Sequence, residues 1–173
     1  MYRKTIKELK DRAVKLGAKE SKVISVKTVK TAAWVRYKCQ FGCSGFAECL
    51  TCPPYSPTPD ETQKILNSFR KAILIHCHKG SRRYRDISKI AFEIEKEAFL
   101  AGYYKALGMG AGPCRLCAEC NLTGECLHRE EARPSMESCG IDVFCTARNN
   151  GYTIETLVST KCSADYFGIV LLE

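Results

Sequence analysis

Long hydrophobic runs are missing from this sequence. No stretch reaches the roughly eighteen apolar residues that a membrane-spanning helix needs. The first residues are largely polar or basic and lack the apolar segment of a secretory signal. Phosphate-binding glycine loops, dinucleotide fingerprints, Ser-His-Asp sets and paired-carboxylate motifs are absent as well. These absences leave the catalytic residues, and whether the protein is an enzyme, undecided. We expect a soluble, cytoplasmic protein.

Cysteine, in contrast, is abundant, with 12 residues in a chain of 173. Two explanations compete: a disulfide framework and a set of metal-binding thiolates. Disulfide-dense proteins are typically small, secreted and rich in loops. This chain is longer, has an apolar fraction of 45% that suits a folded core, and holds most of its cysteines in two tight groups. Short spacings favour chelation of one centre over long-range crosslinking, so we expect thiolates in a reducing compartment.

The net charge is +8, from 27 Lys and Arg against 19 Asp and Glu. Such an excess permits binding to nucleic acid or to an acidic protein. The basic residues are spread along the chain, with small concentrations at the N-terminus and at Ser81–Arg85. An iron–sulfur cluster with four thiolates carries a charge of about −2, which a basic protein partly balances. We therefore expect an acidic electron-transfer protein as partner and no nucleic acid; the sequence does not indicate an oligomeric state.

Hydrophobic periodicity predicts alternating helices and strands in one domain, residues 1–173. We expect helices over residues 4–16, 59–69, 84–102, 134–138 and 142–150, and extended segments over 22–29, 33–38, 72–77, 103–109 and 167–172. This alternation favours an α/β or α+β sandwich, a small mixed sheet packed against helices. Two cysteine-rich loops, 39–52 and 114–126, are expected on one side of it.

The second cysteine group is the better defined of the two. Cys114, Cys117 and Cys120 form a C-x2-C-x2-C motif, and Cys126 follows. Three thiolates at this spacing can surround one iron–sulfur cube, and a fourth can close it, as in bacterial ferredoxin motifs. Structural zinc usually takes two C-x2-C pairs that are separated by a dozen or more residues. The spacing therefore favours a [4Fe–4S] cluster, with zinc as the alternative.

The first group is less regular and contains Cys39, Cys43, Cys49 and Cys52, followed by Pro53. Four thiolates within so short a segment can bind a metal, and proline directly after a ligand cysteine recurs in cluster proteins. Whether Cys49 is a ligand is open. If it is not, the other three leave one iron without a thiolate, and such an iron could bind water or substrate.

Both groups also carry a resemblance to a known family. The matching segments are Cys39-Gln-Phe-Gly-Cys43, Thr51-Cys-Pro-Pro-Tyr-Ser-Pro57, Gly112-Pro-Cys-Arg-Leu-Cys117, Ala132-Arg-Pro-Ser-Met-Glu137 and Gly140-Ile-Asp142. In this order they resemble an uncharacterised prokaryotic family of predicted metal-binding proteins. The resemblance implies metal binding without an assigned reaction. Its pattern centres on Cys39, Cys43 and Cys52 and includes the second group, whereas Cys49 is an addition. Four cysteines fall outside the pattern: Cys77, Cys139, Cys145 and Cys162.

Three histidines have a weaker claim to function. His76 and His78 lie on the same face of an expected strand, and we interpret them as residues of a strand end that reaches solvent. His128 follows Cys126 closely and is a less favoured substitute ligand.

Charged residues after the second group are open to two interpretations. Arg129, Arg133 and Glu137 could recognise an anionic substrate or pair with each other, and we favour pairing. The arginines of Ser81–Arg85 form either a solvated face or a docking patch for an acidic electron carrier.

Three hypotheses follow. The first is a protein with one or two [4Fe–4S] clusters that acts in electron transfer or as a redox subunit. The second is a cluster-dependent enzyme with an open iron at the first group. The third is an interaction module that binds structural zinc.

Overall fold

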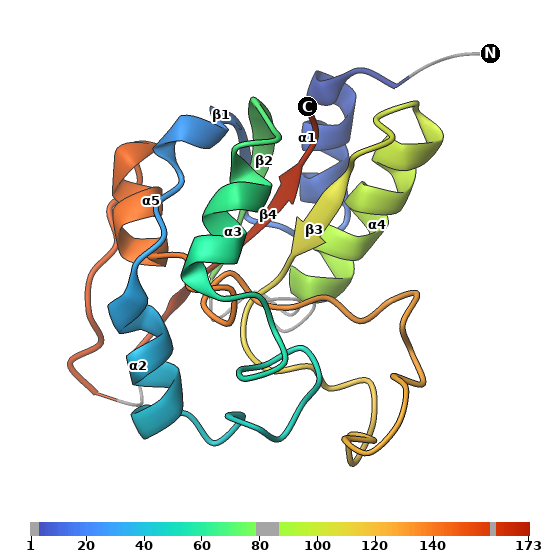
Figure 1. Cartoon of the computed structure of the whole chain (residues 1–173). Helices are drawn as coiled ribbons and strands as arrows, with labels where there is room; N and C mark the ends of the chain where they lie inside the picture. Colours follow the sequence, from blue (N-terminus) through green and yellow to red (C-terminus); the bar gives the residue numbers. More distant parts are fainter. Residues whose placement is uncertain (1–3, 79–86, 160–161) are drawn as a thin grey trace.

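The computed structural model describes residues 4–78, 87–159 and 162–173 (Figure 1). The helices are α1 (Ile6–Lys15), α2 (Ala33–Gly42), α3 (Pro59–Leu66), α4 (Ile87–Leu100) and α5 (Val143–Asn149), with a 3₁₀ turn η1 (Val26–Thr28). The strands are β1 (Glu20–Ser25), β2 (Lys71–His78), β3 (Leu107–Met109) and β4 (Asp165–Leu171). Across the described ranges, every helix is too short or too polar to cross a membrane.

The four strands form one sheet in the order β1-β2-β4-β3. All three neighbouring pairs are antiparallel, and the register sets Leu74 of β2 opposite Ile169 of β4. The central strands β2 and β4 are buried over most of their length. The predicted α+β sandwich is confirmed. The expected mixed sheet is instead antiparallel. The direction of a strand depends on the path of the segments that connect it to its neighbours, and the hydrophobic pattern does not contain that information.

Helices cover both faces of the sheet (Figure 1). On one face, Leu9 of α1 and Ile94 of α4 pack with Ile73 and Val170 of the central strands. On the other face, the core is formed by α3, α5 and the segments around them, which pack on Leu74, Phe167 and Ile169. Both α1 and α3 begin with a complete capping box, Thr5 with Glu8 and Thr58 with Glu61.

The predicted helices at α1, α3, α4 and α5 and the strands at β2 and β4 are confirmed, although residues 84–86 lie outside the described part. The strand expected over 22–29 ends at Ser25, and the one over 103–109 covers only Leu107–Met109. The short helix expected over 134–138 is wrong: this segment is a series of turns, in which Ser135 and Ser138 bond to the backbone. Side chains that bond to nearby backbone groups compete with helix formation.

The extended segment expected over 33–38 is also wrong, because it opens helix α2. Its aromatic and β-branched residues suggested a strand, since these types are enriched in strands. In the structure, Val35 faces the core while Trp34, Tyr37 and Phe41 stay largely exposed along the helix. This difference matters for the site, because Cys39 lies on the last turn of α2.

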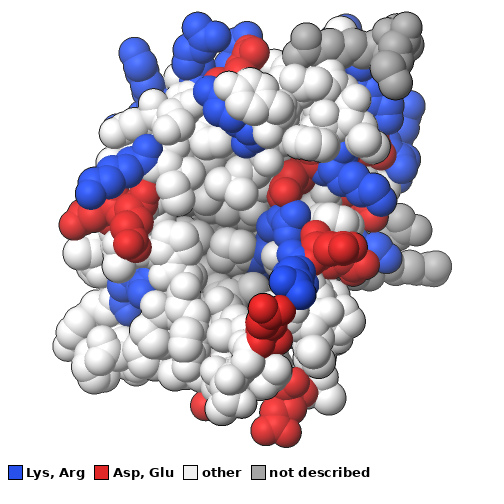
Figure 2. Space-filling model, turned by 45° about the vertical axis from the view of Figure 1, so that its right-hand side comes forward, with Lys and Arg blue, Asp and Glu red and all other residues white. Residues whose placement is uncertain are grey.

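The two cysteine loops lie at the same end of the sheet (Figure 1). One runs from the end of α2 to α3, and the other follows β3. In Figure 2, the charged side chains on the lower part of the visible face, where these loops lie, are mostly acidic, while lysine and arginine gather above it. The excess of positive charge is therefore not concentrated over the cysteine loops on this face.

Gly110 fixes the start of the second cysteine loop against the protein. It exchanges backbone bonds with Pro134 and Met136. A Cβ atom at this position would lie 2.1 Å from Ser88 Oγ and 2.7 Å from Ser88 Cα. We expect Gly110→Ala to lower the free energy of unfolding by about 1–3 kcal/mol through overpacking, measured by urea titration. Gly42→Ala is the matched control: its Cβ would meet nothing within 4 Å. A Gly110→Ala protein as stable as that control would contradict the close packing.

Candidate metal centre

Arg36 of α2 holds the first cysteine loop in place. Its Nη1 atom donates to the carbonyls of Ser56 at 3.2 Å, Pro57 at 2.7 Å and Ser138 at 2.9 Å. Ser56 Oγ donates to the same Ser138 carbonyl at 2.7 Å. One guanidinium therefore ties together α2, the segment after Cys52 and the turn at residues 135–140. Sequence analysis missed this role because Arg36 lay in a segment that was interpreted as a strand.

Cys39, Cys43 and Cys52 lie close together. Cys39 and Cys43 are one helical turn apart at the end of α2, where the Cys43 amide bonds to the Cys39 carbonyl. A Cβ atom on Gly45 would lie 3.7 Å from both Cys43 Sγ and Cys52 Sγ, so these two sulfurs flank Gly45. The Gly45 amide also donates to Cys43 Sγ at 3.4 Å. Cys43 and Cys52 are therefore neighbours across Gly45, and Cys39 lies one turn before Cys43 on α2.

The surroundings of Cys39 and Cys52 raise the pKa of both thiols. Burial raises the pKa of Cys39, the neighbouring Cys43 and Glu137 raise it further, and Arg36 opposes the change. Burial and the neighbouring Cys49 raise the pKa of Cys52 to about 11. Groups of this kind repel each other when charged, and a bound cation removes that repulsion.

The second group surrounds a hollow of about 210 Å³, which Cys114, Cys117, Cys120 and Cys126 all line. Partial burial raises the pKa of Cys117, and its three partner thiols raise it further. The Leu50 amide donates to Cys120 Sγ at 3.4 Å, a contact from the first loop to the second. His128 also lines the hollow. Within the described ranges, no three Cys, His, Asp or Glu side chains converge on a single-ion site.

Cys49 belongs to the first group in sequence but faces the second group in space. It lines the same hollow, and its sulfur lies 3.7 Å from the Cys114 carbonyl oxygen. Burial raises its pKa, as do Cys120 and Cys114, while a hydrogen bond with Cys52 lowers it. Cys49 therefore lies between the two groups, which are direct neighbours. Its role as a ligand stays a prediction.

A larger cavity of about 800 Å³ opens on the first group. It lies between α2, α5 and the segment that leads into β4, and its walls include Cys39, Cys43, Trp34 and Phe144. Glu137 also lines it, a place near the first group that sequence analysis did not predict. Glu137 belongs to the Ala132–Glu137 segment that resembles the family. This resemblance was the sequence signal that could have placed Glu137 at the site.

The other charged candidates have structural partners. Arg133 makes two bonds to Glu95, at 2.6 and 2.7 Å, and Arg129 pairs with Glu125 at 2.8 Å on the surface. The two arginines therefore form ion pairs, as predicted, but their partners are Glu95 and Glu125. Arg129, Arg133 and Glu137 do not pair with each other. The basic segment Ser81–Arg85 lies outside the described residues.

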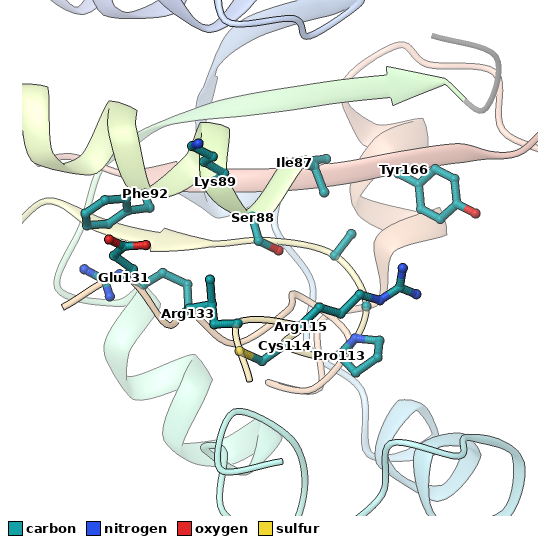
Figure 3. Close-up of a pocket in the computed structure, with 13 residues that line it drawn as sticks. Ile87, Ser88, Lys89, Phe92, Pro113, Cys114, Arg115, Glu131, Arg133 and Tyr166 are labelled. Carbon is teal, nitrogen blue, oxygen red and sulfur yellow. The ribbon is translucent and has the colours of Figure 1, made fainter. Parts of the chain in front are cut away.

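A third cavity, of about 410 Å³, lies beside the second group (Figure 3). Figure 3 shows Ser88 and Lys89 of α4 on one wall and Arg115, Pro113 and Cys114 on the other. Cys114, the first cysteine of the C-x2-C-x2-C motif, therefore lines this cavity as well as the hollow of the second group.

The two strand histidines bind the same carboxylate. His76 Nε2 lies 2.7 Å and His78 Nδ1 lies 2.9 Å from Asp165 Oδ1, which joins β2 to β4. The His76 ring also stacks on Phe167 with centroids 4.8 Å apart. The expected strand end that reaches solvent fits only His78, because the His76 side chain is buried against Phe167.

A family described as predicted metal-binding protein, domain of unknown function 2284, matches residues 22–172. The chain belongs to this family. The matched range contains all 12 cysteines, so both groups lie within the shared part. The searches of curated proteins and of solved structures gave no match. The family resemblance is confirmed. The family description does not name the metal, so the kind of metal must be inferred from the residues of the site.

Proposed function

We propose that this protein carries two neighbouring iron–sulfur centres and takes part in one-electron transfer. Cys114, Cys117, Cys120 and Cys126 would hold a [4Fe–4S] cluster, and Cys39, Cys43 and Cys52 would hold a second centre beside it. The observation that supports the proposal most is the hollow of about 210 Å³ that all four motif cysteines line. A space of this size, with four motif thiols among its lining residues, fits a cluster.

The donor set and the space favour iron–sulfur over zinc. A zinc ion binds four sulfurs at about 2.3 Å, so its ligands close around a single point. The four cysteines of the second group instead line a hollow of about 210 Å³, which leaves room for more than a single ion. Thiolates at C-x2-C-x2-C spacing are also typical of cube-shaped clusters.

The chain contributes the surroundings that tune such a centre. When bound, a [4Fe–4S] cluster supplies a one-electron redox couple. The Leu50 and Gly45 amides each donate to a ligand sulfur at 3.4 Å. Hydrogen bonds to the sulfurs, together with burial, set the potential of a cluster. Cys49, placed between the groups, is an additional thiol at the boundary of the two centres.

A second candidate function is an enzyme that uses the first centre. The cavity of about 800 Å³ beside Cys39 and Cys43 favours it, because an electron relay needs no such space.

The net charge of +8 agrees with an acidic electron-transfer protein as partner. A reducing cytoplasm, where thiolates persist, remains the compartment that we expect.

Metal analysis tests the proposal directly. Protein purified without oxygen should contain about eight iron and eight acid-labile sulfide per chain, and dithionite should bleach its visible absorption. About four of each would indicate one cluster and leave the other group without iron. A colourless protein with zinc and no sulfide would contradict the redox proposal and leave a structural zinc module.

A further inference from the structure

The carboxylate of Glu137 stands out among the polar groups around the large cavity. The residue as a whole is partly exposed, but its Oε2 atom is buried and has no hydrogen-bond partner among the described residues. Buried carboxylate oxygens are normally hydrogen-bonded, since leaving one unpaired is costly. The same side chain lines the cavity that Cys39 and Cys43 also line. The Oε2 atom is therefore available to a group bound in the cavity, while the carboxyl is also held by Ser135 and by its own backbone.

The backbone around Glu137 is firmly held, so this placement is not accidental. Ser138 bonds twice to Ser135, through its amide at 3.0 Å and its hydroxyl at 2.9 Å. The Ser138 carbonyl accepts from Arg36 and from Ser56. Because Arg36 and Ser56 also anchor the segment just after Cys52, one network fixes Glu137 relative to the first cysteine group.

Glu137 and the first group also share one cavity wall, because Glu137, Cys39 and Cys43 all line the large cavity. A carboxylate beside thiols is a set of donors that a bound cation can use.

We propose that Glu137 is the fourth protein ligand of the metal centre formed by Cys39, Cys43 and Cys52. This inference rests on the proposed function and completes the donor set of its first centre. Carboxylate oxygen is an accepted ligand for iron and for zinc alongside sulfur or nitrogen donors. Because Glu137 lines the cavity, its coordination position is also the one that a molecule in the cavity would reach.

The test compares four proteins purified without oxygen: wild type, Glu137→Gln, Glu137→Cys and the matched control Glu130→Gln at an exposed position. We expect Glu137→Gln to lose about one iron per chain and to show the electron paramagnetic resonance of a three-iron cluster. In wild type, Mössbauer spectra should show one iron with a non-thiolate ligand. Glu137→Cys should regain that iron with an all-thiolate signature and a lower reduction potential. Glu130→Gln should match wild type.

Each outcome separates the two proposals. If the iron content and spectra of Glu137→Gln equal those of wild type, Glu137 is not a ligand, even though the iron–sulfur proposal stands. If wild type holds zinc and no sulfide, the redox proposal fails. In that case, a loss of about one zinc in Glu137→Gln would still support ligation, and unchanged zinc would overturn it. Recovery in Glu137→Cys, with an unchanged circular dichroism spectrum, excludes misfolding as the cause of the loss.

Discussion

Cys117→Ser is expected to lose the cluster of the second group, about four iron and four sulfide of about eight. Burial raises the pKa of Cys117, and the three other motif thiols around it raise it further. A serine hydroxyl at this position ionises far less readily than a thiol and is a poor ligand for iron. Iron and sulfide analysis, with the visible spectrum before and after reduction, measures the loss. The iron at the first group should remain, because Cys39, Cys43 and Cys52 are untouched.

Cys162→Ser is the control for this experiment. Cys162 lies outside both groups, at the approach to β4, and its sulfur is 3.3 Å from Ser159 Oγ. We expect this variant to keep its full iron and sulfide content. Equal losses in the two variants would show that cysteine replacement in general, and not ligation by Cys117, removes the metal. Retention of all the iron in Cys117→Ser would contradict the assignment of the four-cysteine site.

Arg36→Met is expected to cost about 3 kcal/mol of unfolding free energy, because it removes a charged donor from several acceptors at once. Arg36 Nη1 lies within hydrogen-bond distance of Ser56, Pro57 and Ser138. Methionine keeps the apolar stem but leaves the buried Ser138 carbonyl with a single donor, Ser56 Oγ. Urea unfolding, followed by circular dichroism, measures the change. Because the same contacts hold the first cysteine group, its iron should be lost as well.

Arg12→Met provides the matched comparison. Arg12 bonds to Glu97 at 2.9 Å, but its side chain is 41% exposed. Exposed ion pairs contribute little, so we expect a loss of less than about 1 kcal/mol and an unchanged iron content. If Arg36→Met were no less stable than Arg12→Met, or kept all its iron, Arg36 would not be the anchor of the first centre.

The two cysteine groups illustrate how spacing and position carry different information. Spacing alone predicted that Cys114, Cys117, Cys120 and Cys126 form one set, and in the structure they line one hollow. Spacing assigned Cys49 to the first group, yet it faces Cys114 and Cys120. A loop can turn within three residues, so neighbours in sequence such as Cys49 and Cys52 can face different partners.

Helix α2 shows where local composition fails. Trp34, Val35 and Tyr37 favour a strand by propensity, which varies by only about 1 kcal/mol between residue types. Burial of Val35 and the bonds of Arg36 outweigh that preference, since tertiary contacts routinely override propensity. The consequence is functional: as a helix, the segment sets Cys39 and Cys43 one turn apart.

The sequence by itself determined the class of this protein: a single α+β fold with strong caps, a buried central strand and two sets of thiols. These features depend on local chemistry, such as the capping boxes at Thr5 and Thr58 and the apolar run of β2. Only the tertiary structure decided that the two sets are neighbours, that Cys49 lies between them and that Glu137 faces the cavity of the first. Such relations arise when segments far apart in the chain pack together. A local sequence pattern does not show which distant segment a residue will contact.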